Sequence, residues 1–198
     1  EAIAALKPDL VLASELNSPE LVASIEKLGI TVYYLANPKS FEELYANLET
    51  VGTLTGHDTT SLVDSLKARG AAVDAKIAPL SYHPIVFYEI DATDPSKPYT
   101  AGVGTFIDLL IARAGGENLT ALAGITDPYP QISLEQLVVT PPDIILLGDS
   151  LYGTTAETVK ARPGWDSLKA VVDGKIFPFD DNLLSRPGPR LVDGLETL

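Results

Sequence analysis

The chain has 198 residues and contains no cysteine, no methionine, two histidines and one tryptophan. The lack of cysteine excludes a disulfide framework, a thiolate metal site and a cysteine nucleophile. Basic residues are also scarce, because 14 lysines and arginines stand against 27 acidic residues and give a formal net charge of -13. No Lys/Arg cluster is present, so nucleic acid is not an expected partner.

Long apolar runs are missing too. A membrane-spanning helix needs roughly 20 apolar residues, and no run of that length and no signal-peptide pattern occurs. We therefore expect no direct membrane insertion by this chain. The chain lacks an initiator methionine and opens at Glu1 directly on a helical pattern, which predicts that sequence upstream of Glu1 is missing.

An internal repeat is the strongest organising feature. The stretches EAIAALKPDLVLA from Glu1 and EQLVVTPPDIILL from Glu135 align without a gap, and each combines a glutamate, a helical pattern, a Pro-Asp turn and an apolar strand. Their spacing is far longer than the period of a solenoid repeat. Each copy is followed by another helix and strand, so the sequence predicts two α/β lobes with parallel sheets.

Helical patterns fill the space between the two lobes. A capping box begins a helix at Ser40, and Asp58 is expected to cap a longer helix that continues to Pro79. The apolar positions of this longer helix recur at helical spacing: Leu62, Leu66, Val73 and Ile77. We predict a partial amino-terminal lobe over residues 1–56, a connecting long helix over 57–79 and a carboxyl-terminal lobe over 80–198.

Common catalytic and phosphate-binding motifs are absent. Neither G-x-x-x-x-G-K-[ST] nor G-x-S-x-G occurs. Gly102 and Gly104 do not complete a dinucleotide fingerprint, because Ile107 stands at the place of the third glycine, and helix entry is the favoured interpretation. His57 and His83 lack metal-ligand spacing. We expect no catalytic residue, no metal site and no resident cofactor.

The positions of three other side chains in the sequence suggest a role in the core or in ligand binding. Trp165 is expected in the core, because apolar residues follow it at helical spacing. Tyr129 lies between two prolines just before a helix start, and either contacts a ligand in a cleft or packs within its loop. Arg186 follows a strand, at the edge where parallel sheets bind ligands; it either binds an anionic group or pairs with an acid such as Asp181.

Glu135 lies in the first turn of a predicted helix. Ser133 and Gln136 have the S-x-x-Q spacing of a capping box, and an acid near the helix start is favoured by the helix dipole. The alternative is that Glu135 contacts a partner.

Taken together, ALKPDLVLA, LGITVYYL, the long connecting helix, YTAGVGTFIDLLIARAGGENL, YPQISLEQL, PDIILL, PGWDSLKAV and LLSRPGPRLV give the chain a recognisable pattern. It resembles the periplasmic solute-binding proteins of ABC importers for metal chelates, a family that includes cobalamin-, ferric siderophore- and haem-binding proteins. The resemblance covers essentially the whole chain, except that the family's first strands and loops are absent. It implies two Rossmann-like lobes joined by one long helix, with the ligand held between them.

The resemblance also implies partners and site residues. Family members of this type dock on their ABC permease through one glutamate on each lobe, and Glu1 and Glu135 match those positions. Tyr129 matches an aromatic residue that contacts the corrin, and Ser14, Asn182 and Arg186 fall at or near other contact positions. Ser14 replaces an aromatic residue and Asn182 an acid, which leaves haem and ferric siderophores open beside cobalamin. Tyr99 and Tyr152 are candidates by position alone.

The resulting hypothesis is a periplasmic or extracellular binding protein with no enzyme activity, with a lipid anchor on a missing amino-terminal segment left open. Two alternatives remain at this point. One is an α/β enzyme on a similar two-lobed scaffold, either a nucleotide-sugar transferase or a nitrogenase-like component, although the phosphate site and cluster cysteines that these need are not found. The other is a structural or receptor-binding module.

Overall fold

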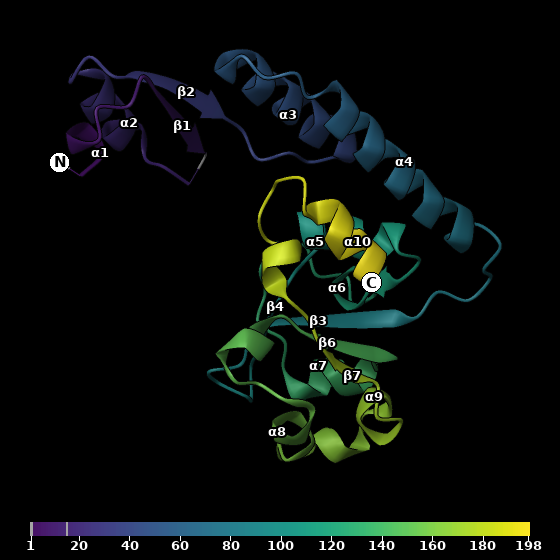
Figure 1. The fold of residues 1–198 in the computed structure, drawn as a ribbon. Helices are drawn as coiled ribbons and strands as arrows, with labels where there is room; N and C mark the ends of the chain where they lie inside the picture. The colour runs from purple at the N-terminus through teal and green to yellow at the C-terminus, as the bar shows by residue number, and fades with distance from the viewer. Residues whose placement is uncertain (1, 15) are drawn as a thin grey trace.

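The structure is a computed structural model that describes residues 2–14 and 16–198. Glu1, one of the two predicted docking residues, lies outside this part of the chain. The amino-terminal lobe contains two helices and two strands: α1 (Ala2–Ala5), β1 (Leu10–Ser14), α2 (Pro19–Glu26) and β2 (Thr31–Leu35). β1 and β2 pair in parallel, as predicted (Figure 1).

The internal repeat is confirmed by the structure. Its second copy forms α7 (Leu134–Val139) and β6 (Ile144–Leu147), in the same order as α1 and β1. Leu10 and Ile144, which align in the repeat, each begin a strand. β6 pairs in parallel with β7 (Ile176–Pro178), just as β1 pairs with β2.

Two long helices follow the first lobe: α3 (Phe41–Thr55) and α4 (Thr60–Ile77). Ser40 caps α3, since its hydroxyl accepts a hydrogen bond from Glu43 N at 3.1 Å. The long helix predicted between the lobes is α4. Of the predicted apolar positions, Leu66 and Val73 are buried and Ile77 is partly buried, whereas Leu62 is exposed and Val63 is buried in its place.

Figure 1 shows α3 and α4 side by side above the second lobe, and side chains of both helices join its apolar cluster. Arg113 joins the three helices α3, α4 and α5 (Phe106–Arg113): its guanidinium lies 4.1 Å from the Phe41 ring centroid, and its Nε is 2.8 Å from Asp74 Oδ1. Arg69 of α4 forms an ion pair with Asp193 of α10 (Leu191–Thr197) at 2.6 Å. The side chains of α3 and α4 therefore share a core with the second lobe, and the predicted boundaries at residues 56 and 79 stay predictions.

The second lobe is built on a sheet with the order β4-β3-β6-β7, and β5 also pairs with β3. The strands not yet given are β3 (Ile85–Asp91), β4 (Tyr99–Thr100) and β5 (Glu117–Asn118). The remaining helices are α6 (Leu119–Leu122), α8 (Ala156–Lys160), α9 (Lys169–Val172) and the 3-10 helices η1 (Gly148–Tyr152), η2 (Trp165–Ser167) and η3 (Asp181–Leu183). Most pairings are parallel, but β4 is antiparallel to β3, so this sheet is mixed where purely parallel pairing was predicted.

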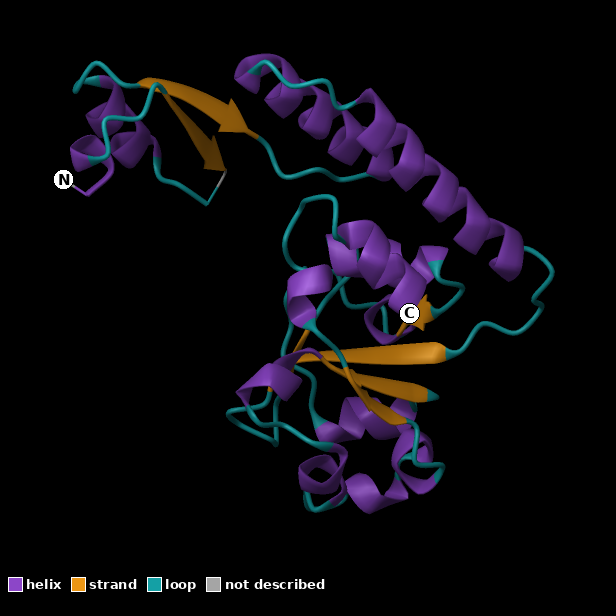
Figure 2. Cartoon of the chain, viewed as in Figure 1, coloured by secondary structure: helices purple, strands orange, loops and turns teal. Residues whose placement is uncertain are grey.

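Helices cover both faces of this sheet (Figure 2). Successive residues of a strand point to opposite faces, and β3 follows this rule: Tyr88 belongs to the apolar cluster under α4 and α10, whereas Phe87 belongs to the cluster on the other face. Trp165 is only 2% exposed, and its ring centroid lies 6.3 Å from that of Phe87. The prediction that Trp165 packs in the core is confirmed.

Candidate ligand cleft

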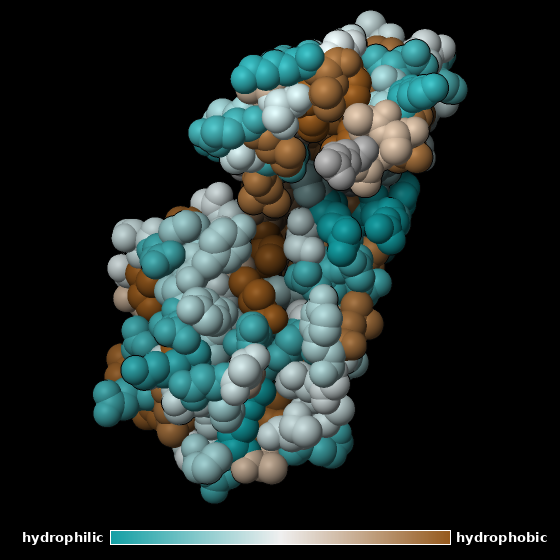
Figure 3. Space-filling model, turned by 90° about the vertical axis from the view of Figure 1, so that its left-hand side faces the viewer, coloured by the Kyte–Doolittle hydropathy of each residue, from teal (hydrophilic) through white to brown (hydrophobic). Residues whose placement is uncertain are grey.

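A cavity of about 320 Å³ lies at the carboxyl ends of β2, β3 and β7. These ends meet from both lobes, which is where parallel α/β folds place ligands. Figure 3 shows brown, apolar atoms along the recess between the upper and lower parts of the molecule. The residues that line the cavity are Asn37, Pro38, Lys39, Ile90, Gly104, Thr105, Phe106, Ile107, Pro128, Tyr129, Asp181, Leu184, Ser185 and Pro187.

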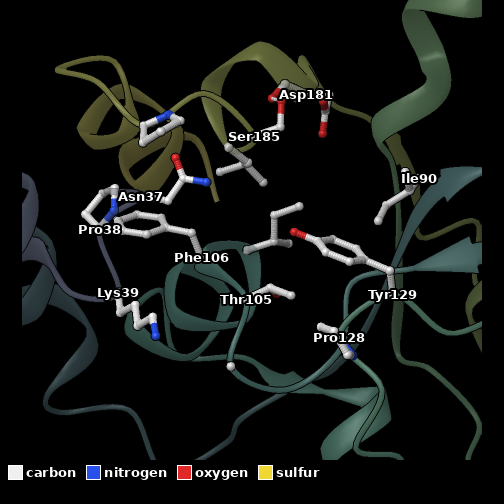
Figure 4. A pocket seen from close by; sticks show the side chains of 14 residues that line it. Asn37, Pro38, Lys39, Ile90, Thr105, Phe106, Pro128, Tyr129, Asp181 and Ser185 are labelled. Atoms are coloured by element: carbon white, nitrogen blue, oxygen red, sulfur yellow. Dashed lines mark hydrogen bonds between the residues drawn. The ribbon is translucent and has the colours of Figure 1, made fainter. Parts of the chain in front are cut away.

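Tyr129 is the aromatic residue that the loop presents to this cavity. It is 56% exposed although Pro130 beside it is buried, and in Figure 4 its ring extends into the space between Thr105 and Ile90. Asp127 holds the loop from within, because its Oδ1 accepts a hydrogen bond from Tyr129 N at 2.9 Å. Of the two sequence interpretations, the structure places Tyr129 at the cavity rather than within its own loop.

Two glycines bring a second loop against the Tyr129 loop. Gly102 N donates to Pro128 O at 2.8 Å, and a Cβ on Gly102 would overlap the carbonyl group of Asp127. Gly104 has φ of 83°, a conformation that glycine adopts without strain. Thr105 then caps α5 by accepting a hydrogen bond from Asp108 N at 3.2 Å. The predicted role of both glycines in helix entry is confirmed.

Polar groups lie on the opposite wall of the cavity. The Tyr88 hydroxyl donates to Asp181 Oδ1 at 2.8 Å, and burial, followed by the charge of Asp181, raises the pKa of Tyr88. Asp181 therefore accepts from a neutral phenol at the edge of the cavity. Lys39, an exposed lining residue, supplies a positive charge (Figure 4).

The other predicted ligand residues do not line this cavity. Asn182 of η3 and Arg186, just after η3, lie next to lining residues and bond to each other, with Arg186 Nε donating to Asn182 Oδ1 at 2.7 Å. This bond replaces the pairing of Arg186 with Asp181 that the sequence left open. Tyr99 is in β4, where it bridges to Gln131.

The last two predicted ligand residues lie elsewhere. Ser14 ends β1 and donates from its backbone N to Asn17 Oδ1 at 2.9 Å. Tyr152 lines a second cavity of about 460 Å³ with Asp149 and Thr154, and this cavity shares Ile90 with the cleft. A ligand role for Ser14, Tyr99, Tyr152, Asn182 and Arg186 stays a prediction.

Several lining residues were not predicted from the sequence. Phe106 and Lys39 each follow a helix start or strand end, and nothing in their local pattern sets them apart from core or surface residues. A topological signal was available for Lys39 alone, because it lies in the loop at the carboxyl end of the parallel strand β2, whereas Phe106 begins α5 after the antiparallel strand β4. Applying that rule to every strand end would have included residues 37–39.

Glu135 lies on a different surface. The capping box of α7 is present, with Gln136 Oε1 accepting from Ser133 N at 2.8 Å and Ser133 Oγ accepting from Gln136 N at 3.4 Å. Glu135 takes no part in the box, and its exposed side chain lines a shallow groove with Leu122 and Val139. The capping box therefore accounts for Ser133 and Gln136 but not for Glu135, whose carboxylate is available to a partner.

Residues 2–14 and 16–198 contain neither a candidate metal site nor a membrane-spanning helix. No group of three or more His, Asp or Glu side chains is arranged there to hold a metal ion. Within the same residues, no helix has both the length and the apolar content required to cross a bilayer.

Two α/β lobes with a cavity at the meeting point of their strand ends define a ligand-binding protein by fold. The family model described as "Periplasmic binding protein" matches residues 1–183, and the chain belongs to this family. The family consists of binding proteins, and the comparisons give the enzyme alternative no support.

Individual relatives of the chain are also named as binding proteins. The chain is 31% identical over 199 residues to a cobalamin-binding protein of Halobacterium salinarum, covering 98% of this chain and 53% of that protein. It is 33% identical over 205 residues to the ABC transporter substrate-binding lipoprotein YvrC of Bacillus subtilis, covering 100% and 63%. The apo periplasmic haem-binding protein RhuT of Roseiflexus sp. RS-1 superposes with a TM-score of 0.88 at 28% identity, covering 100% and 76%. The chain thus spans between about half and two thirds of these two sequence relatives.

Proposed function

We propose that the protein is the extracytoplasmic substrate-binding protein of an ABC importer, and that it captures a cobalamin-, haem- or ferric siderophore-type chelate between its lobes and delivers it to a permease. The observation that carries the proposal is the cavity at the joined carboxyl ends of β2, β3 and β7. Support comes from relatives named as cobalamin-binding, haem-binding and ABC transporter substrate-binding proteins. A lipid anchor belongs to the same proposal, because YvrC is named a lipoprotein.

The cavity chemistry suits a large ligand with an apolar or aromatic body and polar edges. Tyr129 and Phe106 offer ring surface, and Lys39, Asp181 and Ser185 offer a cation, an acceptor and a hydroxyl. Ligand pockets in general combine an apolar lining with a few placed polar groups. We propose that the chelate is held by these contacts, without direct ligation of its metal by a cluster of protein side chains.

The binding experiment titrates the purified protein with cyanocobalamin, haemin and a ferric hydroxamate in separate arms, followed by visible absorption and calorimetry. Tyr129→Ala should weaken binding of the active ligand about tenfold, because an aromatic contact contributes about 0.5–1.5 kcal/mol beyond its buried area and 1.4 kcal/mol corresponds to tenfold. Tyr82→Ala is the control, since Tyr82 is exposed and precedes the opposite end of β3. Equal affinity of both variants would contradict the assigned site.

Docking on the permease is proposed for Glu135. Charge pairs across an interface contribute orientation and association rate more than affinity. Glu135→Gln should therefore leave chelate affinity unchanged and reduce uptake by the reconstituted importer. Glu157→Gln, an exposed acid in the first turn of α8, is the control. Undiminished uptake with Glu135→Gln would remove Glu135 from the docking surface, and a thermal shift with sugar nucleotides would instead revive the enzyme alternative.

A further inference from the structure

Three charged side chains are buried together on the face of the sheet that does not line the cleft. Glu89 of β3 is 0% exposed and lies against Arg162, with Nη1 2.5 Å from Oε2 and Nη2 2.8 Å from Oε1. The Arg162 guanidinium also lies 4.5 Å from the Trp165 ring centroid. Both oxygens of Glu89 are thus held by one cation, the arrangement preferred by an ionised carboxylate.

A second carboxyl reaches the same place from the neighbouring strand. Glu89 pairs in register with Leu147, the last residue of β6, and Asp149 follows in η1, which packs against β3. The Asp149 side chain comes close enough to Glu89 to act on it through its charge and a side-chain hydrogen bond. Asp149 is 6% exposed. Its Oδ2 accepts from Thr154 Oγ1 at 2.8 Å, but its Oδ1 is buried and has no hydrogen-bond donor among the described residues.

An ionised Asp149 would give this cluster two negative charges against one positive charge, with a carboxylate oxygen that receives no hydrogen bond. Buried polar atoms are nearly always hydrogen-bonded, and an unpaired buried charge strongly destabilises the fold. Two carboxyls that share a site resolve the conflict by holding a proton between them. The added proton gives the cluster no net charge and turns an unpartnered acceptor into a donor.

We infer that Glu89 and Asp149 form a buried proton-binding site in which Asp149 Oδ1 and the Glu89 carboxylate share one proton, clamped by Arg162. This inference does not depend on the proposed transport function. Burial, as the largest cause, raises the pKa of Glu89, the hydrogen bonds and charge of Arg162 partly oppose this, and the nearby Asp149 raises the pKa further.

The surroundings of the pair contain few other ionisable groups. Arg162 faces it from the segment after α8, and Tyr88 lies next to Glu89 on β3 but points to the opposite face. Burial, followed by the charge and hydrogen bond of Asp181, raises the pKa of Tyr88. The phenol of Tyr88 therefore stays neutral over the range in which the carboxyl pair titrates, and Arg162 supplies the local positive charge.

The direction of the pH effect follows from the proton count. A buried carboxyl with a raised pKa, here Glu89, holds a proton in the folded state that the unfolded chain has already released, so its stabilising contribution is present at low pH and is lost as pH rises through the folded pKa. Asp149→Asn mimics the protonated acid at every pH, because its amide donates where the proton stood and its carbonyl still accepts from Thr154.

The test measures urea unfolding of the wild-type protein, Asp149→Asn and the exposed control Asp64→Asn from about pH 5 to pH 9, above the ordinary carboxyl pKa values of about 4. The unfolding midpoint of the wild type and of Asp64→Asn should fall relative to that of Asp149→Asn as pH rises. Parallel pH profiles for all three proteins would overturn the inference.

Two further measurements keep the test decisive. Infrared spectra of the wild type near neutral pH should contain the carbonyl band of a protonated carboxyl, and its absence would overturn the inference even if Asp149→Asn fails to fold. Thermal unfolding is repeated with Ca²⁺ and with Mn²⁺. A rise in the unfolding temperature of the wild type that Asp149→Asn lacks would mean that the pair binds a metal cation, which also overturns the shared proton.

Discussion

Gly102→Ala should destabilise the protein and displace Tyr129 at the same time. Gly102 has no positive φ, so alanine meets no backbone strain there, but its Cβ would overlap the Asp127 carbonyl and lie 3.2 Å from Pro128 C. The neighbour is backbone, which cannot rotate away as a side chain can. The loop that carries Tyr129 must therefore move away from the loop that enters α5.

The expected loss of unfolding free energy in Gly102→Ala has two parts. Overpacking a close contact costs about 1–3 kcal/mol, and the hydrogen bond from Gly102 N to Pro128 O contributes about 1 kcal/mol. The expected loss is about 2–4 kcal/mol of unfolding free energy, or roughly 1 M in the urea midpoint for a typical denaturant slope.

Urea unfolding measures this loss, and ligand titration measures the displacement of Tyr129. Gly188→Ala is the matched control, because Gly188 has no atom within 4 Å of its Cβ position and no positive φ. If Gly102→Ala unfolds at the same urea concentration as Gly188→Ala, the two loops are not in the contact described here. If it loses stability but keeps full ligand affinity, the position of Tyr129 does not depend on Gly102.

Two other predictions concern stability. Trp165→Ala should lower the unfolding free energy by about 3–5 kcal/mol, since it empties a core site against Phe87; exposed Leu151→Ala serves as the control, and a similar loss in both would argue against the assigned core. The hydrogen bond from Arg113 lowers the pKa of Asp74, so the stabilisation is present above the unfolded pKa of about 3.9 and is lost as pH falls through the folded pKa. Asp74→Asn should flatten acid unfolding curves, and unchanged curves would show that the pair contributes nothing.

Local features of the fold could be predicted from the sequence, because each depends on residues close together in the chain. The caps at Ser40 and Ser133 need a partner three residues away, and both are present in the structure. The repeat predicted the order of helix and strand in both lobes, since Pro-Asp turns and apolar runs are read directly. The presentation of Tyr129 followed from its two flanking prolines.

Contacts between distant segments could not be predicted. Glu89 and Arg162 are separated by 73 residues, and the surroundings of each in the sequence are those of an ordinary strand and an ordinary helix end. Gly70 lies inside α4, where helix propensity alone marks a glycine as a weak point. In the structure it faces Arg113, whose Nη2 would be 2.6 Å from an added Cβ, so its small size makes room for an arginine from another helix.

Two successive residues of β3 connect the cleft with the buried carboxyl pair. Tyr88 reaches Asp181 at the cavity, and Glu89 reaches Arg162 on the opposite face. Gly148, directly before Asp149, leaves no space for a side chain, because a Cβ there would lie 2.6 Å from the Tyr88 hydroxyl oxygen. A shift of η1 on loss of the proton would therefore press on Tyr88. If the proton site and the cleft are coupled in this way, chelate affinity should fall at high pH in the wild type and stay constant in Asp149→Asn, whereas equal pH dependence in both would show that the sheet separates the two sites.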